Sequence, residues 1–213
     1  KDFDEFLEAT SLPYAPWQVI DSSRHKQAEL ECLESLCSSI ELALQKKAEG
    51  ILPGSQNDPE YDPRQKQFPL VKMPLLSEIP LNQQMSRTEY KEQLKFYQKK
   101  LDHLHDQIYR WKIPVILAYE GWDAAGKGGN IKRITSALDP RGYQVIPIAA
   151  PKPYELARHY LWRFWQRLPK KGHIVIFDRT WYGRVMVERL EGFCSESDWQ
   201  RAYTEINEFE QQL

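Results

Sequence analysis

The chain has 213 residues, of which 41% are hydrophobic, and a formal net charge of −1. This length and apolar content suffice for a sizeable core and exclude a disordered chain, and the near-neutral charge excludes a general basic field, so we expect no nucleic-acid partner. The three cysteines show no metal-ligand spacing and the apolar runs are far shorter than a membrane helix, which predicts a soluble, cytoplasmic protein with no membrane partner.

The N-terminal part of the chain is predicted to contain helices followed by a linker. Residues 1–50 are predicted to be helical in two pieces, separated around Pro13–Trp17. Residues 51–85 are interrupted by repeated prolines, which exclude a long helix because proline lacks the amide that the helix needs. This segment is predicted to be a proline-rich linker.

A long amphipathic helix is predicted to begin at Ser86. Ser86-x-x-Glu89 forms a capping box. Apolar residues then recur at alternating spacings of four and three: Tyr90, Leu94, Tyr97, Leu101, Leu104, Ile108 and Trp111. Such a seam packs on its own domain or at a subunit interface rather than forming a free-standing zipper. We expect a homo-oligomer.

The rest of the chain is predicted to alternate between strands and helices. Strands are predicted at residues 113–119, 143–148 and 173–177, and helices at residues 130–138, 155–168 and 197–213. Repeated strand-helix-strand units predict an α/β fold with a parallel sheet covered by helices. In such folds the ligand binds at the carboxyl ends of the strands.

Residues 121–128 have the G-x-x-x-x-G-K spacing of a phosphate-binding loop, with Gly121, Gly126 and Lys127 at the defining positions. In such a loop the backbone amides and the helix N-terminus face a polyanion, and the lysine adds a positive charge. The alternative is a glycine-rich turn that merely joins a strand to a helix. The position of Lys127, and Asp178 at the end of a second apolar strand, favour a site for phosphoanhydrides.

The residue after the lysine is Gly128, where nucleotide-binding loops commonly have the Ser or Thr that binds magnesium. Another metal ligand is therefore needed. Asp123 lies inside the loop, where its carboxylate would repel phosphate unless a divalent cation stood between them. The sequence predicts that Asp123 and Asp178 bind Mg²⁺; for Asp123 the alternative is a turn or helix cap.

Several longer motifs carry a family resemblance: Glu120–Gly129, Ile131–Arg133, Pro140–Gly142, Phe177–Arg184 and Val187–Arg189. Over residues 75–213 they resemble the polyphosphate kinase 2 family, and the run from His159 to Arg184 is most similar to its polyphosphate:AMP phosphotransferases. The resemblance implies a P-loop kinase-like, three-layer α/β fold. It also implies magnesium-dependent transfer of a phosphoryl group from inorganic polyphosphate to a nucleotide, with AMP preferred to ADP as the acceptor.

The resemblance further implies residue roles. The catalytic residues it implies are Asp123, Lys127, Arg133, Asp178 and Arg179. In this interpretation Asp123 and Asp178 ligate the metal and activate the acceptor, and the two arginines neutralise transition-state charge. The phosphate-binding residues it implies are Gly121, Ala124, Ala125, Gly126, Lys127, Gly128, Gly129 and Arg184. For the arginines the alternative is solvated surface charge.

The sequence departs from the family pattern at two places. Lys152 follows Ala150-Pro151, where the family has a small hydroxyl residue, and the chain ends at Leu213, where the family continues with core strands and a basic lid. Residues 15–21 resemble the closing segment of a domain of the same family. We therefore expect residues 1–50 to be the tail of a preceding domain, with an N-terminal helical extension as the alternative, and residues 86–213 to be a phosphotransferase domain without its C-terminal part and lid.

Two other functions are compatible with these residues. One is a non-catalytic polyphosphate-binding or assembly module that keeps the loop and turns nothing over. The other is an ATP-dependent nucleotide kinase, although Gly128 in place of a hydroxyl residue argues against it.

Overall fold

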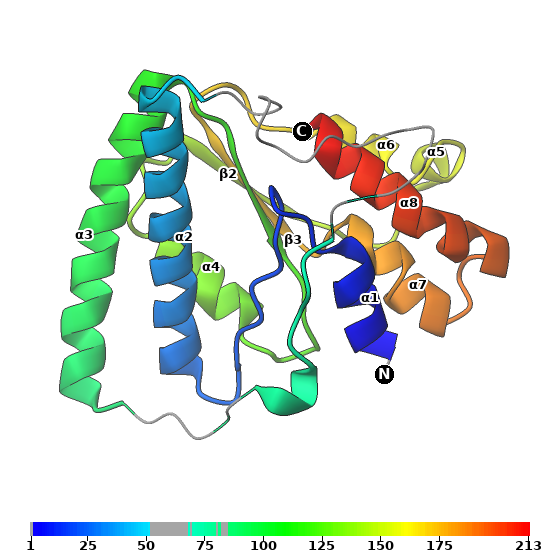
Figure 1. Cartoon of the computed structure of the whole chain (residues 1–213), viewed down its shortest axis with the longest axis horizontal. Coiled ribbons are helices and arrows are strands. Elements are labelled where there is room, and N and C mark those ends of the chain that lie inside the picture. The colour runs from blue at the N-terminus through cyan, green and yellow to red at the C-terminus, as the bar shows by residue number, and fades with distance from the viewer. Residues whose placement is uncertain (1, 52–67, 69, 80, 82–84) are drawn as a thin grey trace. The chain divides into compact units, whose positions relative to one another are not determined.

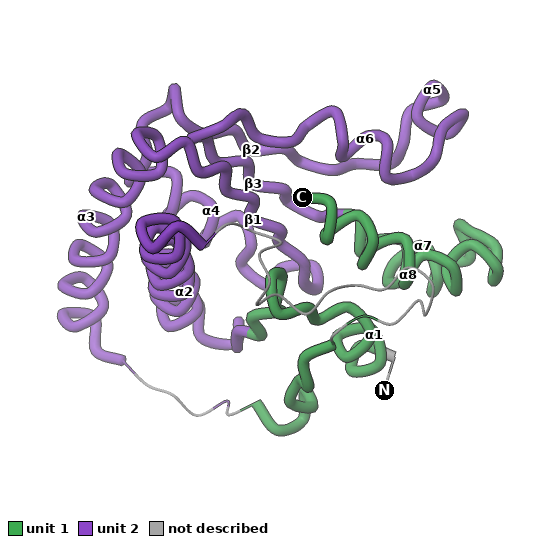
Figure 2. The backbone as a smooth tube through the Cα atoms, turned by 45° about the horizontal axis from the view of Figure 1, so that its top comes forward, with its two compact units in different colours: residues 1–19, 52–79, 181–213 green, residues 20–51, 80–180 purple. Residues whose placement is uncertain are grey.

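The computed structural model describes residues 2–51, 68, 70–79, 81 and 85–213. The chain divides into two units, each discontinuous in sequence (Figure 2). Unit 1 comprises residues 1–19, 52–79 and 181–213, and unit 2 comprises residues 20–51 and 80–180. The domain boundaries expected from the sequence stay a prediction, because most of the proline-rich segment lies outside the described residues.

Among the described residues, unit 2 contains a three-stranded parallel sheet in the order β1-β3-β2. The strands are β1 (Val115–Tyr119), β2 (Tyr143–Pro147) and β3 (Ile174–Asp178). Ile174 of β3 is opposite Val115 on one side and Tyr143 on the other. All of β3 except Asp178 is buried, as expected for the central strand of a parallel sheet covered on both faces. The predicted strands and the predicted parallel sheet are confirmed.

One face of the sheet is covered by α2 (His25–Ala48), α3 (Arg87–Trp111) and α4 (Lys127–Thr135). Figure 1 shows α2 and α3 side by side. These three helices and β3 share one core, formed by Leu33, Leu36, Cys37, Ile40, Leu101, Leu104, Ile108, Ile131, Ile134, Leu138, Ile174 and Ile176. Burial of each large aliphatic side chain stabilises the fold by about 1.5–3 kcal/mol. This core therefore fixes α4, and with it the loop that precedes α4.

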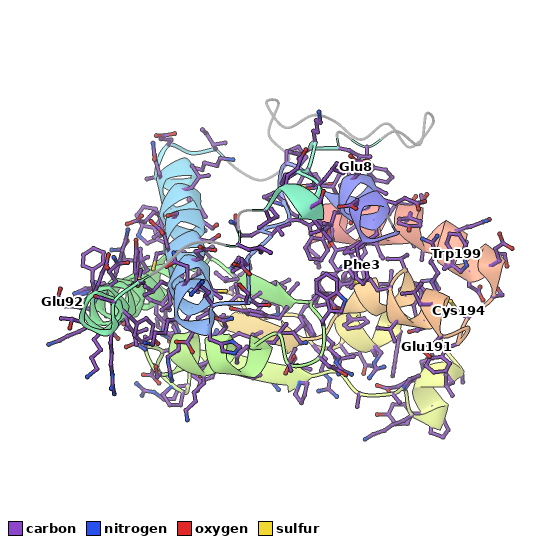
Figure 3. All side chains as sticks on the ribbon, turned by 90° about the horizontal axis from the view of Figure 1, so that it is seen from below. Phe3, Glu8, Glu92, Glu191, Cys194 and Trp199 are labelled. Atoms are coloured by element: carbon purple, nitrogen blue, oxygen red, sulfur yellow. The ribbon has the colours of Figure 1, made fainter. Side chains whose placement is uncertain are left out.

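Helix α3 begins as the sequence predicts, because Ser86 Oγ accepts a hydrogen bond from the Glu89 amide at 3.1 Å. It ends at Lys112, which adopts a left-handed conformation with φ of 57°. Within unit 2 the predicted apolar seam packs on the core that α3 shares with α2, and Trp111 at its end is half-exposed. Glu92 projects from the side of α3 that faces away from α2 (Figure 3).

The opposite face of the sheet carries α6 (Trp162–Trp165), and α5 (Pro153–Leu156) precedes it. Phe164 of α6 packs on Phe177 of β3 with ring centroids 5.7 Å apart, so helices, sheet and helix form three layers. The single helix predicted at residues 155–168 is wrong. The helix ends at Leu156, and His159 Nδ1 then accepts a hydrogen bond from the Leu161 amide at 3.4 Å. Local side-chain hydrogen bonds of this kind compete with the backbone hydrogen bonds of a helix.

Unit 1 is formed by short helices around α8 (Glu196–Gln212). The others are α1 (Asp2–Thr10), η1 (Leu76–Glu78), η2 (Trp181–Arg184) and α7 (Val187–Leu190). Asn207 of α8 donates to the Ala9 carbonyl at 3.0 Å, which ties α1 to α8. The predicted helix at residues 197–213 and the two predicted N-terminal helical pieces are confirmed, although α1 and α2 belong to different units. None of the helices described in either unit is both long enough and apolar enough to cross a bilayer.

Candidate functional site

The loop between β1 and α4 has the backbone conformation of an anion-binding turn. Gly126, the N-cap of α4, has φ of 80°, and Ala124 has φ of 63°. Among the residues that the structure describes, no side chain caps α4 at Gly126. The first amides of a helix have no partner within the helix, and the N-terminus of α4 therefore presents donors and a partial positive charge to an anion.

A cavity of about 450 Å³ lies at this helix N-terminus. It is lined by Ala124, Ala125, Gly126, Lys127, Gly128, Pro147, Ile148, Asp178 and Arg179. Pro147 and Asp178 are the last residues of β2 and β3, so the cavity is at the carboxyl ends of the strands, where ligands bind in open α/β sheets. Seven of the predicted site residues line this one cavity, namely Ala124, Ala125, Gly126, Lys127, Gly128, Asp178 and Arg179.

Lys127 is held by neutral acceptors of its own loop. Its Nζ donates to the carbonyl oxygens of Gly121 at 2.8 Å and Trp122 at 2.9 Å. Carbonyl groups orient the ammonium group but do not neutralise its charge. These hydrogen bonds place the Lys127 ammonium group at the cavity, and Gly121 contributes by holding the lysine.

Arg179 and Asp123 form an exposed ion pair at the rim of the loop. Arg179 Nη2 is 3.0 Å from Asp123 Oδ1, and the two side chains are 58% and 93% exposed. An ion pair this exposed contributes less than about 1 kcal/mol. Little energy is therefore needed for either residue to leave its partner and bind a ligand.

The two predicted metal ligands fit a hard divalent cation, although they are placed differently. Asp178 is half-buried and lines the cavity, whereas Asp123 is paired with Arg179. Among the described residues there is no group of three or more metal-binding side chains. Mg²⁺ needs no such group, since it is held by one or two carboxylates together with water and substrate phosphates. The donor set of Asp178 and Asp123 is therefore suitable for Mg²⁺.

Glu120 is a residue of this region for which no separate role was predicted. Its Oε1 accepts hydrogen bonds from the Thr180 amide at 2.7 Å and the Thr180 hydroxyl at 2.8 Å. Burial raises the pKa of Glu120, and the Thr180 hydrogen bonds and the charges of Lys127 and Arg179 act in the opposite direction. Glu120 thus joins the start of the loop to the chain after β3. An acidic residue directly after an apolar strand was the only signal for this role.

Five predicted site residues do not line the cavity. Gly121 and Asp123 belong to the loop beside it, and the other three lie elsewhere. Arg133 donates from Nε to Glu29 at 3.2 Å and to the Tyr90 hydroxyl at 3.3 Å. A Cβ placed on Gly129 would lie 3.4 Å from Glu29 Oε1, so this glycine faces α2. Arg184 belongs to unit 1, where its Nη1 pairs with Glu188 at 3.0 Å. The predicted roles of these three residues stay predictions.

Comparisons with known sequences agree on one family of proteins. The sequence profile described as Polyphosphate kinase 2 (PPK2) matches residues 84–213. The polyphosphate:AMP phosphotransferases of Pseudomonas aeruginosa and Pseudomonas syringae pv. tomato are each 43% identical, over 99% and 100% of this chain but 41% and 43% of their own length. An ADP-polyphosphate phosphotransferase of P. aeruginosa is 40% identical over 61% of this chain and 43% of its own length. The chain thus spans about two fifths of the length of the curated relatives it matches.

Two solved structures share the fold. A putative polyphosphate kinase 2 from P. aeruginosa is 51% identical with a TM-score of 0.63, over 65% of this chain and 30% of the other. Polyphosphate kinase 2 from Arthrobacter aurescens TC1 is 27% identical with a TM-score of 0.60, over 64% of this chain and 52% of the other. The predicted P-loop kinase-like α/β fold is confirmed.

Proposed function

Because this chain belongs to the polyphosphate kinase 2 family, we propose that its cavity binds inorganic polyphosphate and that the protein transfers the terminal phosphoryl group to AMP, forming ADP. The cavity is the observation that supports this proposal most directly. It combines the N-terminus of α4, the ammonium group of Lys127, and the Asp178 and Arg179 side chains at one edge of the sheet. These are the groups that a chain of phosphates requires.

In the proposed reaction an oxygen of the AMP phosphate attacks the terminal phosphorus of polyphosphate. The new P–O bond forms as the bridging P–O bond breaks, and the polyphosphate leaves one phosphate shorter. The attacking oxygen is already anionic near neutral pH, so no proton has to be removed from it. The protein has little covalent chemistry to perform, and positioning and charge neutralisation supply most of the acceleration.

The charged residues of the cavity and its loop each have a part in this reaction. Lys127 and the amides of residues 124–128 hold the phosphate oxygens, and Arg179 releases Asp123 to neutralise the charge that develops on the transferred group. Asp178 and Asp123 hold the Mg²⁺, which supplies positive charge to the phosphate oxygens when it is bound. The weak Asp123–Arg179 pair supports this division, because both partners are readily available to a ligand.

AMP is the acceptor that the comparisons support best. The relatives named polyphosphate:AMP phosphotransferases match 99% and 100% of this chain, whereas the relative named ADP-polyphosphate phosphotransferase matches 61%. The free state of Cys32, Cys37 and Cys194 supports a cytoplasmic location. The homo-oligomer stays a prediction, because the α3 seam that suggested it packs within unit 2.

The test is to incubate the chain with Mg²⁺ and long-chain polyphosphate, with AMP or ADP in separate reactions, and to resolve the nucleotides by anion-exchange chromatography. Lys127→Ala is the inactive variant, and Lys132→Ala is its matched control, because Lys132 is exposed on the same helix and does not line the cavity. ADP formed from AMP only with intact Lys127 supports the proposal. Lys127-dependent polyphosphate binding without turnover indicates a non-catalytic module, and a requirement for ATP as donor indicates a nucleotide kinase.

A further inference from the structure

Helix α2 lies outside the residues matched by the family profile, yet it belongs to the same unit as the phosphate loop. Its first residue is His25, and a Cβ placed on Gly126 would lie 3.1 Å from His25 Nδ1. One turn further along α2, Glu29 Oε1 would lie 3.4 Å from a Cβ placed on Gly129. The N-terminal end of α2 therefore packs directly on the first turn of α4, and glycines at these two positions allow the approach.

A cluster of three polar side chains joins α2, α3 and α4. Arg133 reaches from the last turn of α4 to Glu29, which faces Gly129 in the first turn. Glu29 Oε2 accepts hydrogen bonds from the Tyr90 hydroxyl and from Arg133 Nε, the latter at 3.2 Å. Arg133 Nε also lies 3.3 Å from the Tyr90 hydroxyl. Glu29 and Tyr90 are each only 8% exposed. Each of the three residues thus contacts the other two, and each comes from a different helix.

The contacts within the cluster shift the pKa values of Tyr90 and Arg133. Burial and the hydrogen bond to Glu29 raise the pKa of Tyr90, and the hydrogen bond to Tyr90 and the charge of Glu29 raise the pKa of Arg133. The phenol therefore keeps its proton, and the guanidinium group keeps its charge. A buried carboxylate needs donors of this kind, because an unpartnered charge in the interior is strongly unfavourable. The contacts between α2, α3 and α4 are therefore specific to these side chains.

We propose that Glu29, Tyr90 and Arg133 are positioning residues, which hold the N-terminal turn of α4 so that the loop amides converge on phosphate. In this arrangement α2 is part of the phosphate site although none of its side chains lines the cavity. Arg133 acts through α4 and does not touch the substrate. The proposal rests on the proposed polyphosphate site, and its test includes a measurement that does not depend on turnover.

The test compares two carboxylates of α2. Glu29→Gln weakens the cluster beside the loop. Glu41→Gln is the matched control, because Glu41 pairs with Lys100 of α3 at 2.9 Å and lies about three helical turns, roughly 18 Å, further along α2. Amide hydrogen exchange of residues 124–130 reports the order of the loop, and titration with a polyphosphate of defined length reports its affinity.

Glu29→Gln is expected to speed exchange of the loop amides and to weaken polyphosphate binding about tenfold, because small misplacements of binding groups have effects of this size or larger. Tyr90→Phe, which removes only a hydroxyl group, is expected to speed amide exchange and to weaken polyphosphate binding, each by about threefold. Glu41→Gln is expected to match the wild type within about twofold. If Glu29→Gln and Tyr90→Phe both fold and both match Glu41→Gln in exchange and affinity, the proposal is wrong.

A double-mutant cycle separates positioning from direct contact of Arg133 with phosphate. If Arg133 positions α4, Arg133→Met lowers kcat about as much as Glu29→Gln, the double variant is little worse than either, and Arg133→Lys restores part of the loss. A direct role predicts a far larger loss for Arg133→Met than for Glu29→Gln, and that result would overturn the assignment. If the wild type turns nothing over while Glu29→Gln still loosens the loop, the proposed function fails and the positioning role stands.

Discussion

Asp123 in unit 2 and Glu210 in unit 1 both accept a hydrogen bond from a nitrogen donor, but their surroundings differ. The Asp123 side chain is 93% exposed and pairs with Arg179. Glu210 is 7% exposed and accepts hydrogen bonds from Trp181 Nε1 at 2.8 Å and from the Tyr182 hydroxyl. The exposed pair contributes little to stability and can rearrange around a ligand. The buried carboxyl is held by its donors, and it affects the stability of unit 1 through its pKa.

The largest effect is expected at the cavity. Lys127→Ala should lower the rate of ADP formation by about 10²- to 10³-fold, because the ammonium group meets developing charge in a site shaped for it. The free energy of unfolding should change by less than about 1 kcal/mol, since the side chain is partly exposed and donates its hydrogen bonds to loop carbonyls. Denaturant titration beside the activity assay checks both expectations. A variant that unfolds would show that this lysine is structural and would weaken the contrast with Glu210.

The second prediction concerns the carboxylate that lines the cavity. Asp178→Asn should lower the rate by roughly 10²-fold and move the midpoint of the Mg²⁺ titration to higher concentration, because an amide is a weaker ligand for a hard cation. The measurement is the rate at a series of Mg²⁺ concentrations at fixed polyphosphate. Asp102→Asn, on α3 and away from the cavity, is the control. An unchanged Mg²⁺ midpoint in Asp178→Asn would reject its role as a ligand.

The third prediction is a pH dependence of stability in unit 1. Burial raises the pKa of Glu210 from 4.5 to about 7, and the hydrogen bonds from Tyr182 and Trp181 act in the opposite direction. The folded state therefore binds more protons than the unfolded state between these two pH values. The stabilisation is fully present below about pH 4.5 and is lost as pH rises through about 7, and it amounts to about 3 kcal/mol.

This pH dependence can be isolated with Glu210→Gln, which keeps the shape of the side chain and cannot ionise. Unfolding followed by tryptophan fluorescence between pH 5 and 8 should show stability falling with pH in the wild type and a flatter profile in the variant. Burial and the charge of Glu210 raise the pKa of Tyr14 to about 12, so Tyr14 does not titrate in this range. Parallel profiles for the two proteins would count against a buried Glu210 that titrates near neutrality.

The smallest expected effect is the change in stability when the exposed Asp123–Arg179 ion pair is removed. Asp123→Asn should change the free energy of unfolding by less than about 1 kcal/mol, because both partners remain solvated. The rate should nevertheless fall if Asp123 binds the metal. Urea titration of the variant measures the first quantity, and the Mg²⁺-dependent rate measures the second. A large loss of stability would place Asp123 with Glu210 as a structural carboxylate.

The local features of this protein could be predicted from its sequence because each depends on neighbours along the chain. The spacing of Gly121, Gly126 and Lys127 after an apolar strand predicted the loop, and seven predicted residues line its cavity. The capping residue Ser86 and the apolar seam predicted α3. The one clear failure, the helix at residues 155–168, arose because its helical periodicity carried no information about the competing bond of His159 or the packing of Phe164 on the sheet.

The sequence by itself determined the family, the parallel α/β fold, and the identity of the loop that begins α4, since these follow from periodicity and from residue spacing within a few tens of residues. Only the tertiary structure decided the partners of the charged side chains. It paired Arg133 with Glu29 and Tyr90, held Lys127 on loop carbonyls, tied Glu120 to Thr180, and buried Glu210 among aromatic donors. Most of these partners lie far apart along the chain. Folding brings them together, and these neighbours decide whether a charged side chain can bind a ligand or is held by the protein.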